Sequence, residues 1–379
     1  MTDTLILGLR NNPQLLQIFI DNLPATFKYA NYFPLTSNIT FKWETLKSQS
    51  RRKNVAADIV ADNSSARYKR RPLFESATGD LPYIKIARKM ERDDIKNYQI
   101  ALALAGNADA QELIRYWADD AEFCFNGIHA EMEYLAWAIL SNACKLGFTG
   151  ANNDGIATEF DLDYQVDDNQ KQTVPVPFTE KATADFIGAC AAAVQAGKAR
   201  GFTPKYAFMN LFEFYKVQSM DQVIRGAASF AANALNISQV PDLAAINAWL
   251  AKQPYVNGLQ IVVVDTEITR EIGNNESVIN PFADNRIVFS PTLVLGSTQY
   301  SKLRKDAKQA IIAERTLATI TKYSENDPYQ EITLGEADAI PVMDTAYHNI
   351  YLKTDGEDWG AANAGAGGGN AGAGGGGLV

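Results

Sequence analysis

The sequence predicts an α+β fold built around one long helix. Apolar residues recur at spacings of three and four over about residues 109–146, which is typical of a single amphipathic helix. Polar and apolar residues then alternate over 159–166, as in a strand with one face in water. From residue 179 onward, short helix-like segments alternate with continuous apolar runs, which indicates a compact α/β unit.

The composition is that of a folded protein with a sizeable core. The chain has 379 residues, of which 46% are hydrophobic and 21% are charged, enough for two or three compact units. The net charge of -9 disfavours a dedicated nucleic-acid binder, because tight phosphate contact needs a surplus of lysine and arginine.

The first 42 residues contain only short apolar clusters, which are broken by Pro13, Pro24 and Pro34. This pattern predicts an arm that crosses a surface without a core of its own. The start of the chain has no basic stretch, and its apolar cluster is too short to span a bilayer, so neither export nor membrane insertion is expected.

A basic segment follows the arm. Between Lys47 and Arg71 there are eight basic residues against two acidic ones, a local balance of +6 in an acidic chain. The segment fits a solvated loop, a phosphate-contacting site or an arm that docks on an acidic neighbour, and its few aromatic residues make base stacking the weaker hypothesis. As candidate contacts with another subunit we take Lys47, Arg51, Arg52, Lys53, Arg67, Lys69, Arg70 and Arg71.

The long helix is predicted to begin at Asp109, which with Glu112 forms a capping pattern, and to end at Gly147. At ~1.5 Å per residue it would be roughly 55 Å long, so we expect a spine that packs over a sheet. The stretch 302–323 fits either helix or strand. Further helices are expected at 180–199, 211–225 and 242–251, and strands at 206–209, 259–264, 287–295, 330–334 and 349–353, with an Ile-Pro-Val segment at 340–342 between the last two.

The last twenty residues, 360–379, include ten glycines, six alanines and two asparagines. Side chains this small bury too little surface to offset backbone entropy, so we expect a flexible tail unless a neighbour orders it.

His129, Glu131 and Glu133 are the nearest approach to a catalytic cluster. His129 and Glu133 share a helix face at i and i+4, a spacing that can hold a metal, but only His348 is available as a second histidine. The Pro-Cys-x-x-Cys segment that accompanies His-x-Glu in zinc deaminases is missing. We therefore expect His129 and Glu133 to be ordinary surface positions of the spine. The three cysteines, Cys124, Cys144 and Cys190, are expected to be buried, reduced thiols.

The order of these elements resembles the tailed-bacteriophage major capsid proteins of the Hong Kong 97 fold, in particular the lambda-like major capsid protein E group. The resemblance covers roughly residues 30–356 and includes the segment Leu81-Pro82-Tyr83-Ile84-Lys85-Ile86 before the spine and the Ile340-Pro341-Val342 segment after the α/β unit. It implies an α+β fold with an N-terminal arm (1–42), an extended E-loop hairpin (43–91), a P-domain with the spine helix (92–178), an α/β A-domain (179–328), P-domain return strands (329–356) and the tail (357–379).

The function that the resemblance implies is structural. The subunit would self-assemble into hexamers and pentamers of a precursor shell that matures into an icosahedral phage head around double-stranded DNA. Portal and scaffold proteins are implied partners, and decoration proteins are further candidates. Assembly would take place in the host cytoplasm, and the product would be the virion capsid. No catalytic residue, cofactor or metal is implied, and no lysine and asparagine pair for covalent cross-linking is assigned.

Three alternatives remain open at this point. An encapsulin-like nanocompartment shell would share the fold. A metal-dependent hydrolase would use His129, Glu133 and His348. A DNA-binding virion protein would use the basic segment 47–71, and its binding to free DNA would depend strongly on salt.

Overall fold

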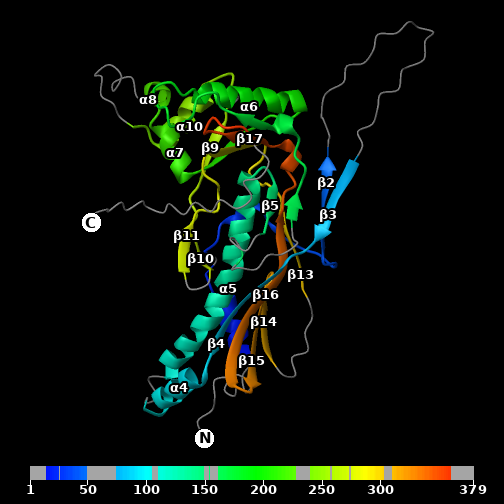
Figure 1. Ribbon diagram of the computed structural model, residues 1–379, viewed down its shortest axis with the longest axis vertical. Helices are drawn as coiled ribbons and strands as arrows, with labels where there is room; N and C mark the ends of the chain where they lie inside the picture. Colours follow the sequence, from blue (N-terminus) through cyan, green and yellow to red (C-terminus); the bar gives the residue numbers. More distant parts are fainter. Residues whose placement is uncertain are drawn as a thin grey trace, which may run out of the picture. The chain divides into compact units, whose positions relative to one another are not determined.

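A computed structural model describes residues 14–24, 26–48, 74–104, 110–148, 153, 161–227, 240–256, 258–272, 275–302 and 310–359. The chain divides into two compact units (Figure 1). The first takes the described residues of Met1–Ser48, Phe74–Ala136 and Val294–Asp344, and the second takes those of Trp137–Leu293 and Thr345–Val379. The predicted mixture of helices and sheets is confirmed, while the domain ranges implied by the resemblance remain predictions.

The first unit is built on a mixed sheet. Five strands follow one another in the order β1, β13, β16, β15, β14, and β4 pairs with the other side of β16. All pairs are antiparallel except that of β1 with β13. The bounds are β1 Leu35–Ser37, β4 Tyr83–Met90, β13 Ser297–Ser301, β14 Ile311–Arg315, β15 Ala318–Asn326 and β16 Tyr329–Val342.

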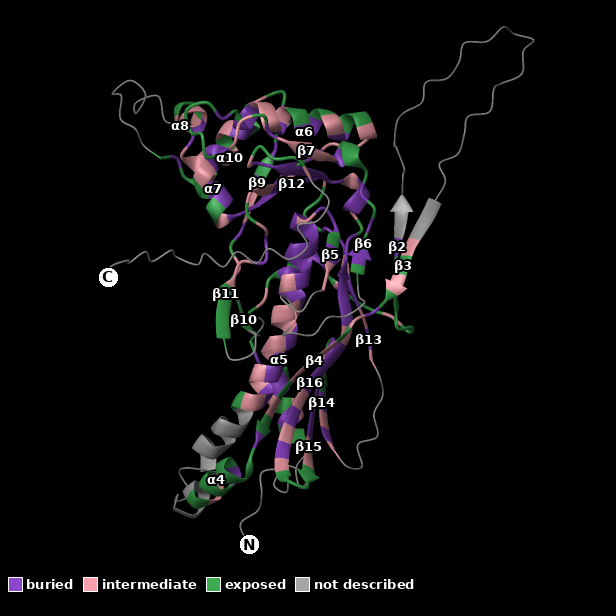
Figure 2. Cartoon of the chain, viewed as in Figure 1, coloured by how far each residue is buried: buried purple, intermediate pink, exposed green. Residues whose placement is uncertain are grey.

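The predicted spine is helix α5, Ala110–Ser141, which packs on one face of this sheet. The thiol of Cys124 donates a hydrogen bond to the carbonyl oxygen of Thr333, at 3.5 Å. Gly335 allows the close approach, because a Cβ there would lie only 3.0 Å from the Cys124 carbonyl oxygen. Over the described side chains of α5, the expected apolar stripe is buried (Figure 2) and includes Ala121, Cys124, Ile128, Met132 and Leu135. Helix α4, Arg92–Leu104, precedes it.

The spine ends at Ser141, five residues before the expected last residue of its apolar stripe, Leu146. Ala143 and Cys144 adopt left-handed backbone conformations, with φ of 52° and 59°, which stop the helix. The Cys144 N–H still donates to the Ile139 carbonyl oxygen, at 2.9 Å. Gly147 is therefore not a helix cap but the last residue of strand β5, Lys145–Gly147, which pairs with β6, Asp161–Asp163. The expected N-cap, Asp109, lies outside the described residues.

The described part of the predicted arm, residues 14–24 and 26–37, packs against other parts of the first unit. This stretch forms helix α2 (Gln14–Asn22), helix α3 (Tyr29–Tyr32) and strand β1. Gln17 and Glu314 exchange two hydrogen bonds, of 2.9 and 3.0 Å, which tie α2 to β14. The same chain supplies the core of the arm, because at most 1% of the surface is exposed for Leu16, Ile20, Tyr29 and Phe33.

Two further predictions are corrected near the C-terminal end of the first unit. Strand β16 runs without a break from Tyr329 to Val342, so the expected separate segment at 340–342 is part of it. Pairing between β16 and β4 ends at Asp338, so β4 does not extend alongside Pro341. The missing N–H of Pro341 is therefore tolerated on that side of the strand. The ambiguous stretch contains strands β14 and β15, and 303–309 lie outside the described residues.

The second unit holds a five-stranded sheet in the order β7, β17, β12, β8, β9. Its strands are β7 Lys171–Thr173, β8 Tyr206–Asn210, β9 Gln260–Val264, β12 Arg286–Ser290 and β17 Ile350–Lys353. The helices are α6 Phe186–Arg200, α7 Leu211–Gln218, α8 Asp221–Ala227 and α10 Leu243–Ala251. Helix and sheet residues share one apolar core, which includes Phe186, Cys190, Met209, Ile246, Ile287 and Leu352.

Three segments of the second unit are shorter or more divided than expected. The helix predicted over 211–225 is split into α7 and α8. The strand predicted over 287–295 ends at Ser290, because Pro291 follows and has no N–H for the ladder. Of the strand predicted over 159–166, residues 161–166 are described, and among these only Asp161–Asp163 pair as a strand, although the alternating burial continues to Val166. A two-stranded hairpin, β10 (Ile268–Ile272) and β11 (Asn275–Ile279), completes the unit.

The three cysteines are buried and form no disulfide, as predicted. Burial raises the pKa of the Cys124 thiol to about 11 and that of Cys144 to about 12. Among the described helices, none combines the length and apolar character needed to cross a membrane.

Candidate functional site

A β-hairpin in the first unit leads to the predicted contact residues. Strands β2 (Lys42–Ser48) and β3 (Phe74–Asp80) pair from Lys42 with Asp80 to Ser48 with Phe74. Lys47 lies in β2, although its side chain is outside the described part of the chain. The other seven predicted residues are outside it altogether, namely Arg51, Arg52, Lys53, Arg67, Lys69, Arg70 and Arg71.

The base of this hairpin is fixed to the sheet by polar contacts. The side-chain amide of Gln299 donates to the Glu44 carbonyl oxygen, at 2.7 Å, and its oxygen accepts from the Glu44 N–H, at 3.0 Å. The Thr45 hydroxyl donates to the carboxylate of Asp344, at 2.7 Å. Trp43 is buried against Gly79, where a Cβ would lie 2.6 Å from the indole nitrogen. The hairpin therefore leaves the sheet from a defined position.

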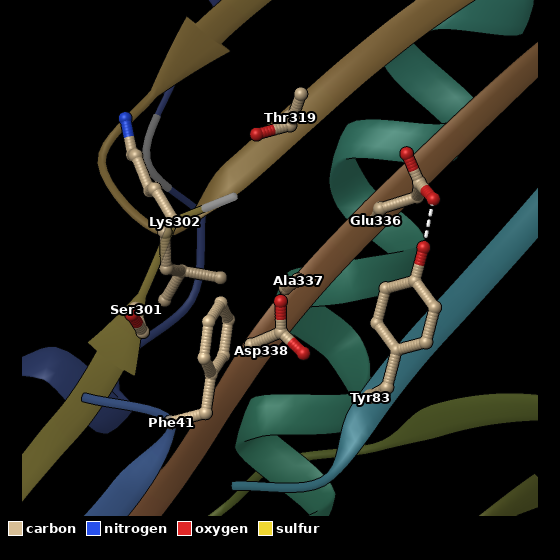
Figure 3. Close-up of a pocket in the computed structure, with 9 residues that line it drawn as sticks. Phe41, Tyr83, Ser301, Lys302, Thr319, Glu336, Ala337 and Asp338 are labelled. Atoms are coloured by element: carbon tan, nitrogen blue, oxygen red, sulfur yellow. Dashed lines mark hydrogen bonds between the residues drawn. The ribbon is translucent and has the colours of Figure 1, made fainter. Parts of the chain in front are cut away.

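A pocket of about 270 Å³ opens beside the hairpin base, all within the first unit (Figure 3). Phe41 and Tyr83 are about half exposed in it, at 45% and 50%. The Tyr83 hydroxyl donates to the carboxylate of Glu336. The residues that line the pocket are Phe41, Tyr83, Ser301, Lys302, Leu317, Thr319, Glu336, Ala337 and Asp338.

The pocket combines carboxylates with half-exposed aromatic rings. Its one lining lysine, Lys302, is paired with Glu314 at 3.1 Å. Burial and the carboxylate of Asp338 raise the pKa of the Tyr83 hydroxyl, so it stays protonated and donates to Glu336. Lys85 already places its ammonium 4.3 Å from the centre of the Tyr83 ring. Two carboxylates beside aromatic rings favour a cationic side chain in this pocket.

A cluster of charged side chains joins α5 to the face of the sheet on which this helix packs. Only 4% of the surface of Lys322 is exposed. Burial lowers the pKa of its amine to about 7, although the nearby carboxylates of Asp120 and Glu331 act to raise that pKa. Burial also raises the pKa of the Asp120 carboxyl. Arg88 lies 3.2 Å from Asp119 and 3.6 Å from Asp120. These charges compensate one another where the helix crosses the sheet.

His129 and Glu133 are not surface positions, which corrects the sequence interpretation. Glu133 is fully buried, and its carboxylate accepts hydrogen bonds from the backbone N–H groups of Lys28 and Tyr29, at 2.9 and 2.8 Å. His129 shares a 2.8 Å hydrogen bond with the Tyr29 hydroxyl. Burial, assisted by the charge of Arg315, lowers the pKa of His129 to about 4, so its ring is neutral.

This arrangement holds the N-terminal segment and does not favour the hydrolase hypothesis. Both candidate ligands of α5 already have partners in the fold, since Glu133 binds the start of α3 and His129 binds Tyr29. Within the described ranges, no group of three or more histidine, cysteine, aspartate or glutamate side chains is placed to hold a metal ion. The sequence showed the i, i+4 pair, but the partners of that pair lie about a hundred residues away.

The solved structures that share this fold include two phage proteins. One is a candidate capsid protein from a prophage of Escherichia coli CFT073, with a TM-score of 0.53, 13% identity, and coverage of 90% of this chain and 97% of that chain. The other is a phage-related protein from Bordetella bronchiseptica RB50, with a TM-score of 0.50, 11% identity and the same coverage. No protein-family model matches the sequence, and no curated protein is significantly similar to it. Over 90% of its length, the chain has the fold of these two phage-related proteins, as its resemblance to tailed-phage capsid proteins predicts.

Proposed function

We propose that this chain is the major structural subunit of a tailed-phage head, which self-assembles into the hexamers and pentamers of an icosahedral capsid around double-stranded DNA. The observation that carries the proposal is the shared fold, which covers 97% of a candidate prophage capsid protein and 90% of this chain. The role is structural, and the proposal assigns no substrate, cofactor or metal.

The basic segment supplies contacts between copies in this proposal. Identical subunits arranged head to tail present one surface to a different surface of the next copy, and complementary charge sets their register. The segment between Lys47 and Arg71 has a balance of +6, whereas the whole chain has a net charge of -9. We infer that its basic side chains meet acidic surface on a neighbouring copy, and the pocket that contains Glu336 and Asp338 is the candidate receiver.

The remaining partners follow from the assembly role. Portal and scaffold proteins would act during formation of a precursor shell, and decoration proteins would bind the finished one. The assembled protein would reside in the virion after assembly in the host cytoplasm. DNA would be enclosed without sequence-specific contacts, which the acidic net charge supports.

Electron microscopy of the purified protein, together with size-exclusion chromatography, tests the assembly. Shells, tubes or capsomer rings are expected, either alone or after addition of the scaffold protein of the source phage. A protein that stays monomeric or dimeric under both conditions would contradict the proposal.

Charge reversal tests the basic segment separately. The double variant R70E/R71E is expected to fold but to assemble poorly, because exposed charge changes usually cost little stability. The matched control K198E/K205E reverses two exposed lysines of the second unit and should assemble like the wild type. Normal particles from R70E/R71E would remove the basic segment from the proposed interface while leaving the shell role intact.

A further inference from the structure

A lysine amine, an asparagine amide and a buried carboxylate meet in the second unit. The Nζ atom of Lys216 lies 2.9 Å from Oε2 of Glu213 and donates a hydrogen bond to Oδ1 of Asn285. Glu213 and Lys216 are one turn apart on α7, and Asn285 directly precedes β12. The three groups are a nucleophile, an acyl electrophile and a proton carrier.

Glu213 is held in place by contacts on all sides. Its side chain is fully buried, and Oε1 accepts a 2.6 Å hydrogen bond from the hydroxyl of Thr354 on the segment after β17. Its backbone N–H donates to the Asn210 side chain, at 2.7 Å, which caps α7. The Asn210 amide in turn donates to Asp284, at 2.6 Å. One network therefore fixes the carboxylate and the residue before Asn285 together.

Asn285 is fixed through its backbone. It has a left-handed conformation with φ of 58°, and its carbonyl oxygen accepts from the Thr354 N–H, at 3.0 Å, and from the Arg286 guanidinium, at 3.1 Å. Both the amine and the amide thus project from backbone positions that have little freedom to move. Such preorganisation converts an otherwise slow reaction between two side chains into an effectively unimolecular one.

We propose that Lys216 and Asn285 join in an isopeptide bond within one chain, with Glu213 as the catalytic acid and base. Glu213 takes a proton from the Lys216 ammonium, and the freed amine attacks Cγ of Asn285. The new Nζ–Cγ bond forms and the Cγ–Nδ2 bond breaks. Nδ2 leaves as ammonium with the two protons that Nζ gives up, one of which is carried by Glu213. No oxidant or other reactant is consumed.

The surroundings suit this step. The carboxylate is removed from water, which strengthens its interaction with the amine. About a quarter of the Lys216 side chain is exposed, 27%, so ammonium has a route to solvent. The bond would tie α7 to the start of β12 across 69 positions of the sequence, within the second unit.

Intact-mass spectrometry of the purified full-length protein tests the proposal. The wild type is expected to be lighter than its sequence mass by about 17 Da, the mass of one ammonia. Proteolysis should release a branched peptide that joins the Lys216 and Asn285 segments. This peptide distinguishes the bond from ammonia loss elsewhere, such as at Asn257-Gly258. A wild type with the full sequence mass, or an ammonia loss without the branched peptide, would overturn the proposal.

Variants assign the roles. Lys216→Arg and Asn285→Ala should each show the full sequence mass, whereas Glu213→Gln should retain the unlinked mass for longer after purification. As a matched control, Lys171→Arg alters a lysine that also pairs with a carboxylate three positions away, Asp168 at 3.3 Å. It should lose ammonia like the wild type. Ammonia loss that persists in Asn285→Ala would contradict the assignment, and the wild-type branched peptide decides the question even if a variant fails to fold.

Discussion

The hydroxyl of Tyr29 lies 2.8 Å from Nδ1 of His129, although the two residues are 100 positions apart. This hydrogen bond, together with the Glu133 carboxylate, fastens the N-terminal segment to the spine. The segment belongs to the folded body of the first unit. Substitutions of His129 or Glu133 on α5 should therefore change the stability of the N-terminal segment.

The stability of the protein should fall as the pH is lowered from about 6.5 to about 4. Burial lowers the folded-state pKa of His129 to about 4, while the unfolded chain has its ordinary value near 6.5. Between these values only the unfolded state binds the proton, so acid favours unfolding, by about 3 kcal/mol at most. Urea unfolding of wild type and His129→Gln at pH 7 and pH 4.5 measures this contribution. The variant should lose less stability than the wild type over this range, and equal losses would contradict the assignment.

Replacing Glu133 by glutamine should loosen the N-terminal segment. The carboxylate accepts two backbone N–H groups in a buried site, and a neutral amide makes weaker hydrogen bonds, so we expect a loss of about 1–3 kcal/mol. Limited proteolysis should cut Glu133→Gln faster near residues 22–28. The control Asp119→Asn removes an exposed carboxylate of the same helix and should be cut at the wild-type rate. Equal cleavage of the two variants would argue against the anchor.

Two glycines at the interface between α5 and the sheet should respond oppositely to alanine. At Gly335 a Cβ would meet the Cys124 backbone oxygen at 3.0 Å, so Gly335→Ala should destabilise the protein by about 1–3 kcal/mol. At Gly127 the obstacle is the terminal methyl group of Ile86, which can rotate away. Helix propensity then favours Gly127→Ala by up to about 1 kcal/mol. Thermal unfolding of both variants distinguishes them, and a stable Gly335→Ala would show that the helix can move away.

Deleting residues 360–379 should leave the subunit folded. Glycine and alanine make up sixteen of these twenty residues, and side chains of that size add little to a core. Circular dichroism and the thermal midpoint of the truncated chain should match those of the full chain. A loss of soluble folded protein would show that the tail contributes to the fold.

Local patterns predicted the elements that depend on neighbouring residues. The stripe from Ala121 to Leu135 is a property of one helix, and its period identified α5 without any tertiary information. The end of α5 was missed because Ala143 and Cys144 have no residue preference for a left-handed turn. That turn is stabilised by distant contacts, including the one between the Cys144 thiol and the Tyr351 hydroxyl, at 3.0 Å.

The polar sites were less predictable, because their members come from distant parts of the chain. Glu213 and Lys216 have an ordinary i, i+3 spacing, and only the folded chain brings Asn285 to them from 69 positions beyond Lys216. His129 and Glu133 were interpreted as exposed because charged positions on a helix usually are. Nothing near them in the sequence indicates that Tyr29 covers them.

The pairing of β4 with β16 also determines when the sheet of the first unit can form during translation. Ile84 lies opposite Ala337, so β4 leaves the ribosome some 250 residues before its partner strand exists. At translation rates of about 5–20 residues per second, this delay is roughly 10–50 seconds. Strand β1 is likewise synthesised long before its partner strand, β13. A nascent chain therefore cannot complete the sheet of the first unit until translation is nearly finished, and until then β4 and β1 lack the strands with which they pair.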